Sequence, residues 1–161
     1  MRQLEETEFR DYVLARMGTL RRTAYLLCRD WFLADDLASI TVGKLYRHWA
    51  RARDMAHLDA YVRQILVRTW LDERARPWRR EEPTENVPES PAAAEPDPLQ
   101  RARLAGLLAE LPIGRRAAVV LRFYCDMSVH ETARIMGCSV GTVKSQTARA
   151  LDTLRTRVAQ P

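Results

Sequence analysis

Glycine is scarce in this sequence of 161 residues, with only six in the whole chain. Alanine, leucine and arginine recur instead, and these residues favour helices over sheets. The sequence has no Gly-rich phosphate-binding loop and no nucleophile and base in a pattern typical of catalysis. We therefore predict an all-α protein that is not an enzyme.

Cysteine is also rare, with three residues in total, Cys28, Cys125 and Cys138. Their odd number and the lack of a CxxC pair argue against a disulfide framework. Cys125 and Cys138 lie near His130 in sequence, but a fourth zinc ligand at suitable spacing is missing. We expect structural cysteines, no metal site and no cofactor.

A long apolar run is missing as well. The most apolar stretch, residues 117–127, contains Arg122 and is too short to span a membrane. Acids dominate the first residues, unlike the basic start of a signal peptide. These features predict a cytoplasmic protein without a membrane partner.

The formal net charge of +5 understates how basic most of the chain is. Residues 81–98 hold six of the 21 acids and no lysine or arginine, so the other residues carry a net charge of +11. Such a surplus suits a polyanionic partner such as nucleic acid. An ordinary solvated, arginine-rich surface is the alternative.

Helical periodicity divides the chain into two blocks. Apolar residues follow helical spacing across residues 5–76, most clearly from Leu58 to Thr69, and predict three helices. Residues 77–98 lose this periodicity and hold five prolines after Glu81, which predicts a flexible, acidic, Pro-rich linker. We expect domains at 1–76 and 99–161. The linker is either a solvated tether or a mimic of nucleic acid.

In the second block, Pro112 suits the first turn of a helix whose apolar stripe, from Ile113 to Tyr124, predicts the buried centre of the domain. Ser128 and Glu131 then form a capping-box pattern before a helix of about two turns. Gly137 suits a left-handed residue that ends this helix, and Ser139 can cap the next one. A short helix, a tight turn and a second helix predict a helix-turn-helix.

The second helix of this motif has one apolar face and one polar, basic face. Such a helix can enter the major groove of DNA with its first turns near the base edges. The alternative is a helical hairpin with an ordinary solvated face. The residues predicted to contact duplex DNA are Ser139, Gly141, Thr142, Lys144, Ser145, Gln146 and Arg149.

A different chemistry appears near the end of the first block, where Arg63, Trp70 and Arg74 share one side of the predicted helix. Aromatic rings among arginines suit unpaired bases, because the rings stack on bases and the cations hold the backbone. For Trp70 the alternative is that its ring only widens the apolar core.

With these two basic helical blocks, the chain resembles the extracytoplasmic-function (ECF) RNA polymerase sigma factors, of the actinobacterial SigE-like type. The resemblance covers nearly the whole length. It rests on "LRRTAYLLCRDWFLADDLASITVGKLYRHW", "DAYVRQILVRTWLDERAR" and "LAELPIGRRAAVVLRFYCDMSVHETARIMGCSVGTVKSQTARALDTLR", with the acidic spacer between the last two. It implies a factor that binds core RNA polymerase, directs it to promoters and assists their melting.

The resemblance also assigns tasks to segments. Residues 1–76 correspond to sigma region 2 and residues 99–161 to region 4. Residues 50–57 and 59–80 are implied to read and open the −10 element, with Arg68 beside Arg63, Trp70 and Arg74. The helix-turn-helix is implied to read the −35 element. The residues implied to bind the β′ clamp helices of the polymerase are Asp35, Asp36, Leu37, Leu45 and Tyr46.

Further partners implied by the resemblance are promoter DNA, the polymerase β flap and an anti-sigma factor. Two other functions stay open from the sequence alone. One is a stand-alone helix-turn-helix regulator that dimerises and binds DNA without polymerase. The other is a degenerate sigma-like protein that sequesters a partner, because Ser39 and Val42 differ from the common pattern of the core-binding helix.

Overall fold

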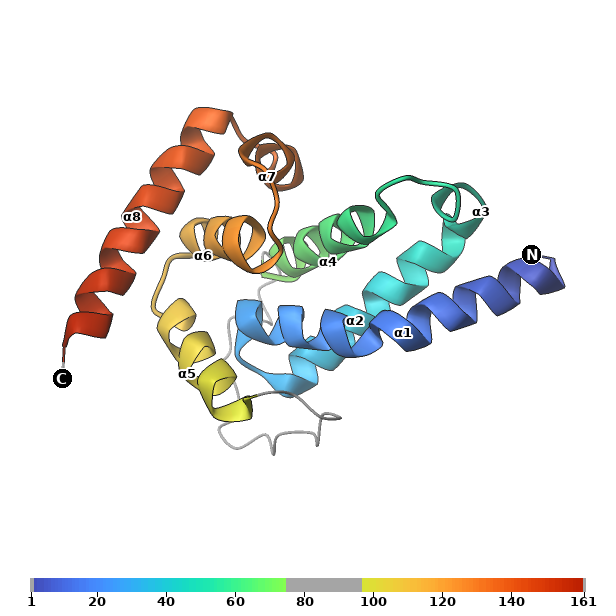
Figure 1. Ribbon diagram of the computed structural model, residues 1–161, viewed down its shortest axis with the longest axis horizontal. Helices are drawn as coiled ribbons and strands as arrows, with labels where there is room; N and C mark the ends of the chain where they lie inside the picture. The colour runs from blue at the N-terminus through green and yellow to red at the C-terminus, as the bar shows by residue number, and fades with distance from the viewer. Residues whose placement is uncertain (1, 75–96, 161) are drawn as a thin grey trace. The chain divides into compact units, whose positions relative to one another are not determined.

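The structure, a computed structural model, describes residues 2–74 and 97–160, where every regular element is helical (Figure 1). These residues group into two compact units, one of residues 2–24 and 30–74 and the other of residues 25–29 and 97–160. The predicted all-α fold is confirmed. No helix in the described ranges is both long and apolar enough to cross a membrane. The predicted linker falls mostly outside these residues.

The first unit is built mainly from α1 (Gln3–Cys28), α2 (Trp31–Arg47), α3 (Trp49–Ala52) and α4 (Leu58–Arg74). The sequence predicts α1, α2 and α4. It misses α3, because a single turn is too short to show a periodic apolar stripe. The carboxylate of Asp30 caps α2 by accepting hydrogen bonds from the backbone amides of Phe32 and Leu33.

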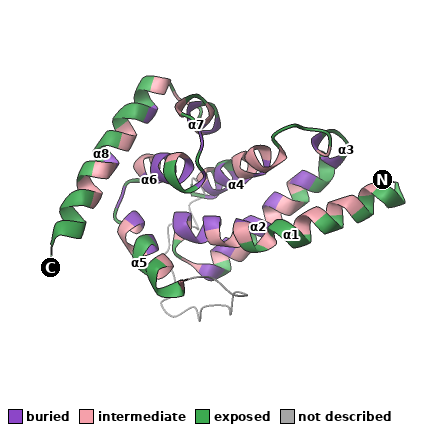
Figure 2. Cartoon of the chain, in the orientation of Figure 1, coloured by how far each residue is buried: buried purple, intermediate pink, exposed green. Residues whose placement is uncertain are grey.

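The core of the first unit lies between α2 and α4. Leu37 and Leu66 are fully buried there, and Figure 2 shows buried residues along both helices. Near the start of α1, the Trp49 indole N–H donates to the Glu5 carbonyl at 3.0 Å, and the Phe9 ring meets the Trp49 ring edge to face at 5.3 Å. These contacts hold α1 against the short helix α3.

The second unit contains α5 (Pro98–Ala109), α6 (Ile113–Val119), a π-helix (Val120–Tyr124), α7 (Val129–Met136) and α8 (Val140–Ala159). Asp97 caps α5 by accepting from the Gln100 amide at 3.1 Å, and Pro98 occupies the first turn. From the sequence, both residues are predicted to lie in the linker. The helix therefore starts slightly earlier than we predicted.

The predicted buried centre of the second unit is confirmed at Ala117, Val120 and Leu121, each at most 1% exposed. The predicted stripe does not continue to Tyr124, which is 43% exposed. The backbone changes to a π-helix at Val120, where the Cys125 amide donates to the Val120 carbonyl at 2.9 Å. This wider turn interrupts the α-helical period and leaves Tyr124 outside the core.

Candidate nucleic-acid interface

The joint between α7 and α8 has the local geometry that the sequence predicts. Ser128 caps α7 by accepting from the Glu131 amide at 3.0 Å. Gly137 ends α7 in the left-handed conformation, with φ of 68°, which glycine adopts at little cost. Ser139 then caps α8 by accepting from the Thr142 amide at 3.1 Å. Three residues thus separate two helices that meet at the sharp turn seen in Figure 1.

Small and branched apolar residues fix α8 against its neighbours. Ala133 of α7 is 6% exposed, and Val143 and Ala150 of α8 are fully buried. α8 packs on both α6 and α7 in the second unit. Because only these positions are deeply buried, the rest of the helix surface is available for other contacts, as the exposed length of α8 in Figure 2 shows.

Most of the residues predicted to contact duplex DNA are exposed around the N-terminal half of α8. They are Ser139, Gly141, Thr142, Lys144, Ser145 and Arg149. Gln146 differs because it is only half exposed and faces α6. A Cβ atom placed on Gly114 would lie 3.1 Å from the Gln146 amide nitrogen. Gln146 therefore helps to pack α8 on α6.

The single acid of α8 does not reduce the basic character of this face. This acid, Asp152, lies one turn beyond Arg149 and pairs with Arg155 at 3.4 Å. Arg157 pairs with Glu110 at the end of α5 at 3.3 Å. Lys144 and Arg149 therefore keep their charges toward solvent, as an anion-binding surface needs.

The residues predicted to bind unpaired DNA differ in how far the fold exposes them. Arg68 and Arg74 of α4 are exposed, and Arg63 is half exposed. The Trp70 side chain is 0% exposed, so its ring is not accessible to a base in this structure. This differs from the stacking role that we expected and agrees with the alternative, in which Trp70 widens the core.

The residues predicted to bind polymerase also differ in exposure. Asp36 and Tyr46 of α2 are exposed. Leu37 and Leu45 are 0% and 1% exposed, so they support this face from beneath and cannot contact a partner directly. The α2 stripe that carries these two leucines packs into the first unit, so the prediction that they bind polymerase remains only as an indirect role.

Asp35 is the remaining residue predicted to bind polymerase, and it already has a partner inside the first unit. Its carboxylate pairs with Arg21 of α1. The Arg21 guanidinium also lies over the Trp31 ring, 5.0 Å from its centroid. About half of the Asp35 side chain is exposed, so one carboxylate edge remains accessible.

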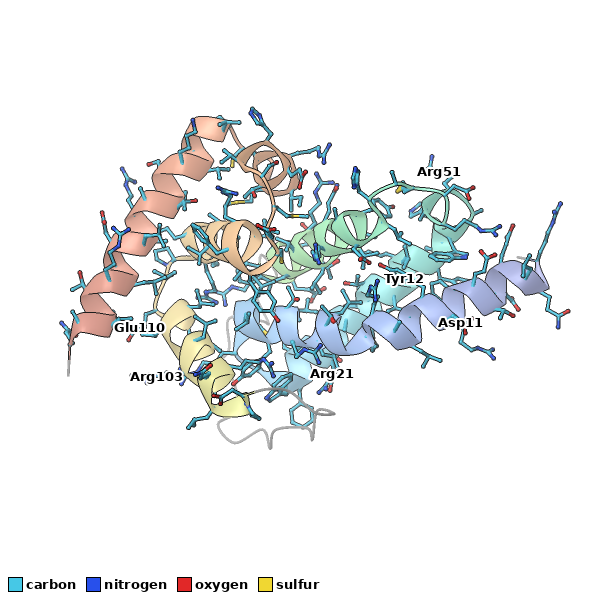
Figure 3. All side chains as sticks on the ribbon, in the orientation of Figure 1. Asp11, Tyr12, Arg21, Arg51, Arg103 and Glu110 are labelled. Atoms are coloured by element: carbon cyan, nitrogen blue, oxygen red, sulfur yellow. The ribbon has the colours of Figure 1, made fainter. Side chains whose placement is uncertain are left out.

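A polar cluster between α1 and α4 was not predicted from the sequence. The Tyr12 hydroxyl donates to Oδ1 of Asp59 at 2.6 Å, and Nε of Arg16 donates to the same oxygen at 3.1 Å. Figure 3 shows Tyr12 on the side of α1 toward α4. The partners are more than 40 residues apart in sequence, so no local pattern indicates their contact.

This cluster fixes the protonation states of its members. Burial opposes ionisation of Asp59, but the hydrogen bonds from Tyr12 and Arg16 outweigh it, and the pKa of Asp59 lies below its ordinary value. Burial, together with the bond to Asp59, raises the pKa of Tyr12 well above its ordinary value. At neutral pH the tyrosine therefore keeps its proton and the aspartate is a charged acceptor.

The described residues contain no group of three or more His, Cys, Asp or Glu side chains arranged to hold a metal ion. None of the three cysteines forms a disulfide within the described residues, and Cys125 is buried. The exposed start of α8 carries basic and polar side chains, which can bind anions and base edges.

Sequence comparisons place these features among known proteins. Residues 101–154, which include the helix-turn-helix, match the family model described as Sigma-70, region 4. The chain is 39% identical over 156 residues to the RNA polymerase sigma-E factor of Streptomyces coelicolor, covering 94% of this chain and 86% of that protein. It is 36% identical over 156 residues to the sigma-E factor of Streptomyces avermitilis, covering 94% and 85% of the two chains.

Solved structures show the same architecture. The sigma factor RpoE of Bartonella quintana, in complex with the anti-sigma factor NepR, matches with a TM-score of 0.71 at 26% identity, over 95% of this chain and 99% of that one. CnrH, in complex with the cytosolic domain of CnrY, matches with a TM-score of 0.62 at 21% identity, over 95% and 88%. The second likeness concerns the fold alone.

Proposed function

Because the chain belongs to the ECF group of RNA polymerase sigma factors, which direct the polymerase to promoters, we propose a division of labour between its two units. The first unit binds core polymerase and the unpaired strand of the −10 element. The second unit reads the −35 element as intact duplex. The observation that carries this proposal is the exposed, acid-free start of α8 behind a joint capped by Ser139.

For the −35 element, the start of α8 combines small polar side chains with an accessible helix N-terminus. Gly141, Thr142 and Ser145 allow close approach to base edges. The positive end of the helix dipole and Lys144 favour nearby phosphates. Gln146, which packs on α6, orients the helix, and the residues before it contact the base edges.

For the −10 element, exposed Arg68 and Arg74 and half-exposed Arg63 supply cations along α4. Residues 50–57, which lead into α4, are the segment proposed to hold an unpaired base. Trp70 contributes indirectly, because its buried ring holds α4 in the core of the first unit. Cations without an exposed tryptophan suit the DNA backbone more than base stacking.

For core polymerase, the proposed contact is the exposed face of α2, with Asp36, Tyr46 and the accessible edge of Asp35. Arginines on the polymerase would pair with the two carboxylates, and the Tyr46 ring would add apolar contact. The second unit would contact the polymerase β flap. Catalysis belongs to the polymerase, so the chain acts without a cofactor in the cytoplasm, where transcription takes place.

An anti-sigma protein is a further proposed partner. The similar solved structure of the sigma factor RpoE is a complex with the anti-sigma factor NepR. A partner of this kind would compete with polymerase or DNA for the exposed faces of α2 and α8.

Reconstitution with core polymerase tests this function. The purified chain and core enzyme are incubated with genomic fragments, and run-off transcripts are mapped to their start sites. We expect transcripts from a small set of fragments that share two sequence elements, and none from core enzyme alone. Core binding without such transcripts would contradict promoter recognition and favour a sequestering protein. Specific duplex binding by a dimer without polymerase would favour a stand-alone regulator.

A further inference from the structure

A hollow of about 230 Å³ lies between α1 and α4 in the first unit, beside the cluster of Tyr12, Arg16 and Asp59. Its floor is apolar, formed by Leu20 and Val62, which are 6% and 2% exposed. Its walls are polar. They combine a carboxylate, two guanidinium groups and three hydroxyls, from Asp59, Arg16, Arg63, Tyr12, Thr19 and Thr23.

The cluster leaves one oxygen of Asp59 for a ligand. Tyr12 and Arg16 both donate to Oδ1, and the second carboxylate oxygen, Oδ2, has lone pairs that can accept from a ligand. The Asp59 side chain is 43% exposed and charged at neutral pH. A fixed carboxylate disfavours a bare phosphate here and favours a ligand that presents N–H groups.

A nucleotide matches the remaining walls of the hollow. The flat faces of a base can lie on the apolar floor of Leu20 and Val62. The backbone phosphate can pair with Arg16 or Arg63, which stand beside the carboxylate. The apolar floor, the carboxylate acceptor of Asp59 and the neighbouring cations therefore fit one nucleotide of a single strand.

The hollow continues into the segment proposed to hold the −10 strand. A second hollow of about 410 Å³ is lined by Met55, Ala56 and His57 from the loop before α4. It shares Tyr12, Arg16, Asp59 and Arg63 with the first hollow. A strand that follows this loop can therefore place a neighbouring base between α1 and α4.

We propose that the hollow between α1 and α4 binds one base of the unpaired promoter strand, and that Asp59 selects a base with an exocyclic amino group over thymine. The proposal rests on the sigma-factor function above and adds α1 to the elements that read DNA. An amino group can donate to Oδ2 of Asp59. Thymine instead presents carbonyl oxygens on both sides of its N–H, and these repel the carboxylate.

The test uses holoenzyme on one promoter that the reconstituted wild type transcribes. Templates carry each of the four bases at every position of the melted strand, and open complexes are measured by permanganate footprinting and run-off transcription. At one position of the melted strand, we expect wild-type holoenzyme to form about tenfold fewer open complexes with thymine than with the other bases. Asp59→Asn should abolish that preference alone, because an amide can also donate to a thymine carbonyl. Unchanged preferences in Asp59→Asn, or an equal loss at every position, would overturn the proposal.

Matched variants separate this reading role from a structural one. Asp11→Asn removes an exposed charge from α1, outside the hollow, and should keep every wild-type preference. Thr19→Leu fills the hollow without touching Asp59, and should lower open-complex formation and remove the thymine discrimination. Normal discrimination in folded Thr19→Leu, checked by circular dichroism, would overturn the proposal even if Asp59→Asn failed to fold. Wild type without promoter-dependent transcription would instead contradict the sigma-factor function itself.

Discussion

At the scale of single residues, Arg149 is the clearest candidate for a phosphate contact. It is exposed on α8, nearly three turns after the Ser139 cap, whereas base edges are read mainly by the first turns of a recognition helix. We expect Arg149→Ala to weaken holoenzyme binding to −35 duplexes equally across sequences and to reduce the salt slope by about one. Electrophoretic titrations at several KCl concentrations measure both effects.

Arg155→Ala is the matched control for Arg149. Arg155 is exposed on another side of the same helix and pairs with Asp152, so its loss should leave promoter binding near the wild-type level. A loss confined to one base position in Arg149→Ala would contradict a phosphate contact and indicate base readout.

Trp70 is expected to affect stability and not DNA binding, because its ring is fully buried. We expect Trp70→Ala to destabilise the protein by about 3–5 kcal/mol through the cavity that it leaves. Trp70→Phe should cost less and keep the base preferences of the holoenzyme at temperatures where it is folded. Urea denaturation and open-complex assays measure the two properties. Normal stability with impaired promoter opening in Trp70→Ala would contradict a structural role.

At the scale of elements, the turn between α7 and α8 depends on the conformation of Gly137. Its φ of 68° disfavours residues with a Cβ atom, although open space surrounds it. We expect Gly137→Ala to destabilise the protein by about 1 kcal/mol. Gly43→Ala is the control, because Gly43 lies inside α2, also in open space, and alanine favours helix. It should stabilise by about 0.5–1 kcal/mol. If urea denaturation showed that both variants were stabilised, or that both were destabilised, this account would be contradicted.

The same elements show which features a sequence can predict. Ser128, Gly137 and Ser139 act through hydrogen bonds or dihedral angles within a few residues, so their roles were visible in the sequence. For Trp70 the sequence left stacking on bases and packing in the core both open, because the main apolar stripe of α4 does not show how wide its buried face is. The contact of Tyr12 with Asp59 depends on how α1 packs against α4, and no short-range pattern encodes such packing.

At the scale of the whole molecule, charge is divided unevenly along the chain. Residues 81–98 carry six acids and no base, and the rest of the chain carries a net charge of +11. Asp97 has a structural task as the cap of α5, so it must be kept in any test of linker charge. The other five acids of the segment are Glu81, Glu82, Glu85, Glu89 and Glu95.

Changing these five residues to glutamine removes five negative charges and moves the formal net charge from +5 to +10. We expect the neutralised chain to bind non-specific duplex DNA more tightly, on the order of tenfold at low ionic strength, because phosphate attraction grows with net positive charge. Fluorescence anisotropy at increasing KCl should show the difference fading as salt screens it. A chain with the same linker residues in shuffled order keeps the charge and should bind like wild type. Wild-type affinity of the neutralised chain at every salt concentration would mean that the acidic segment does not restrain binding of the basic units to DNA.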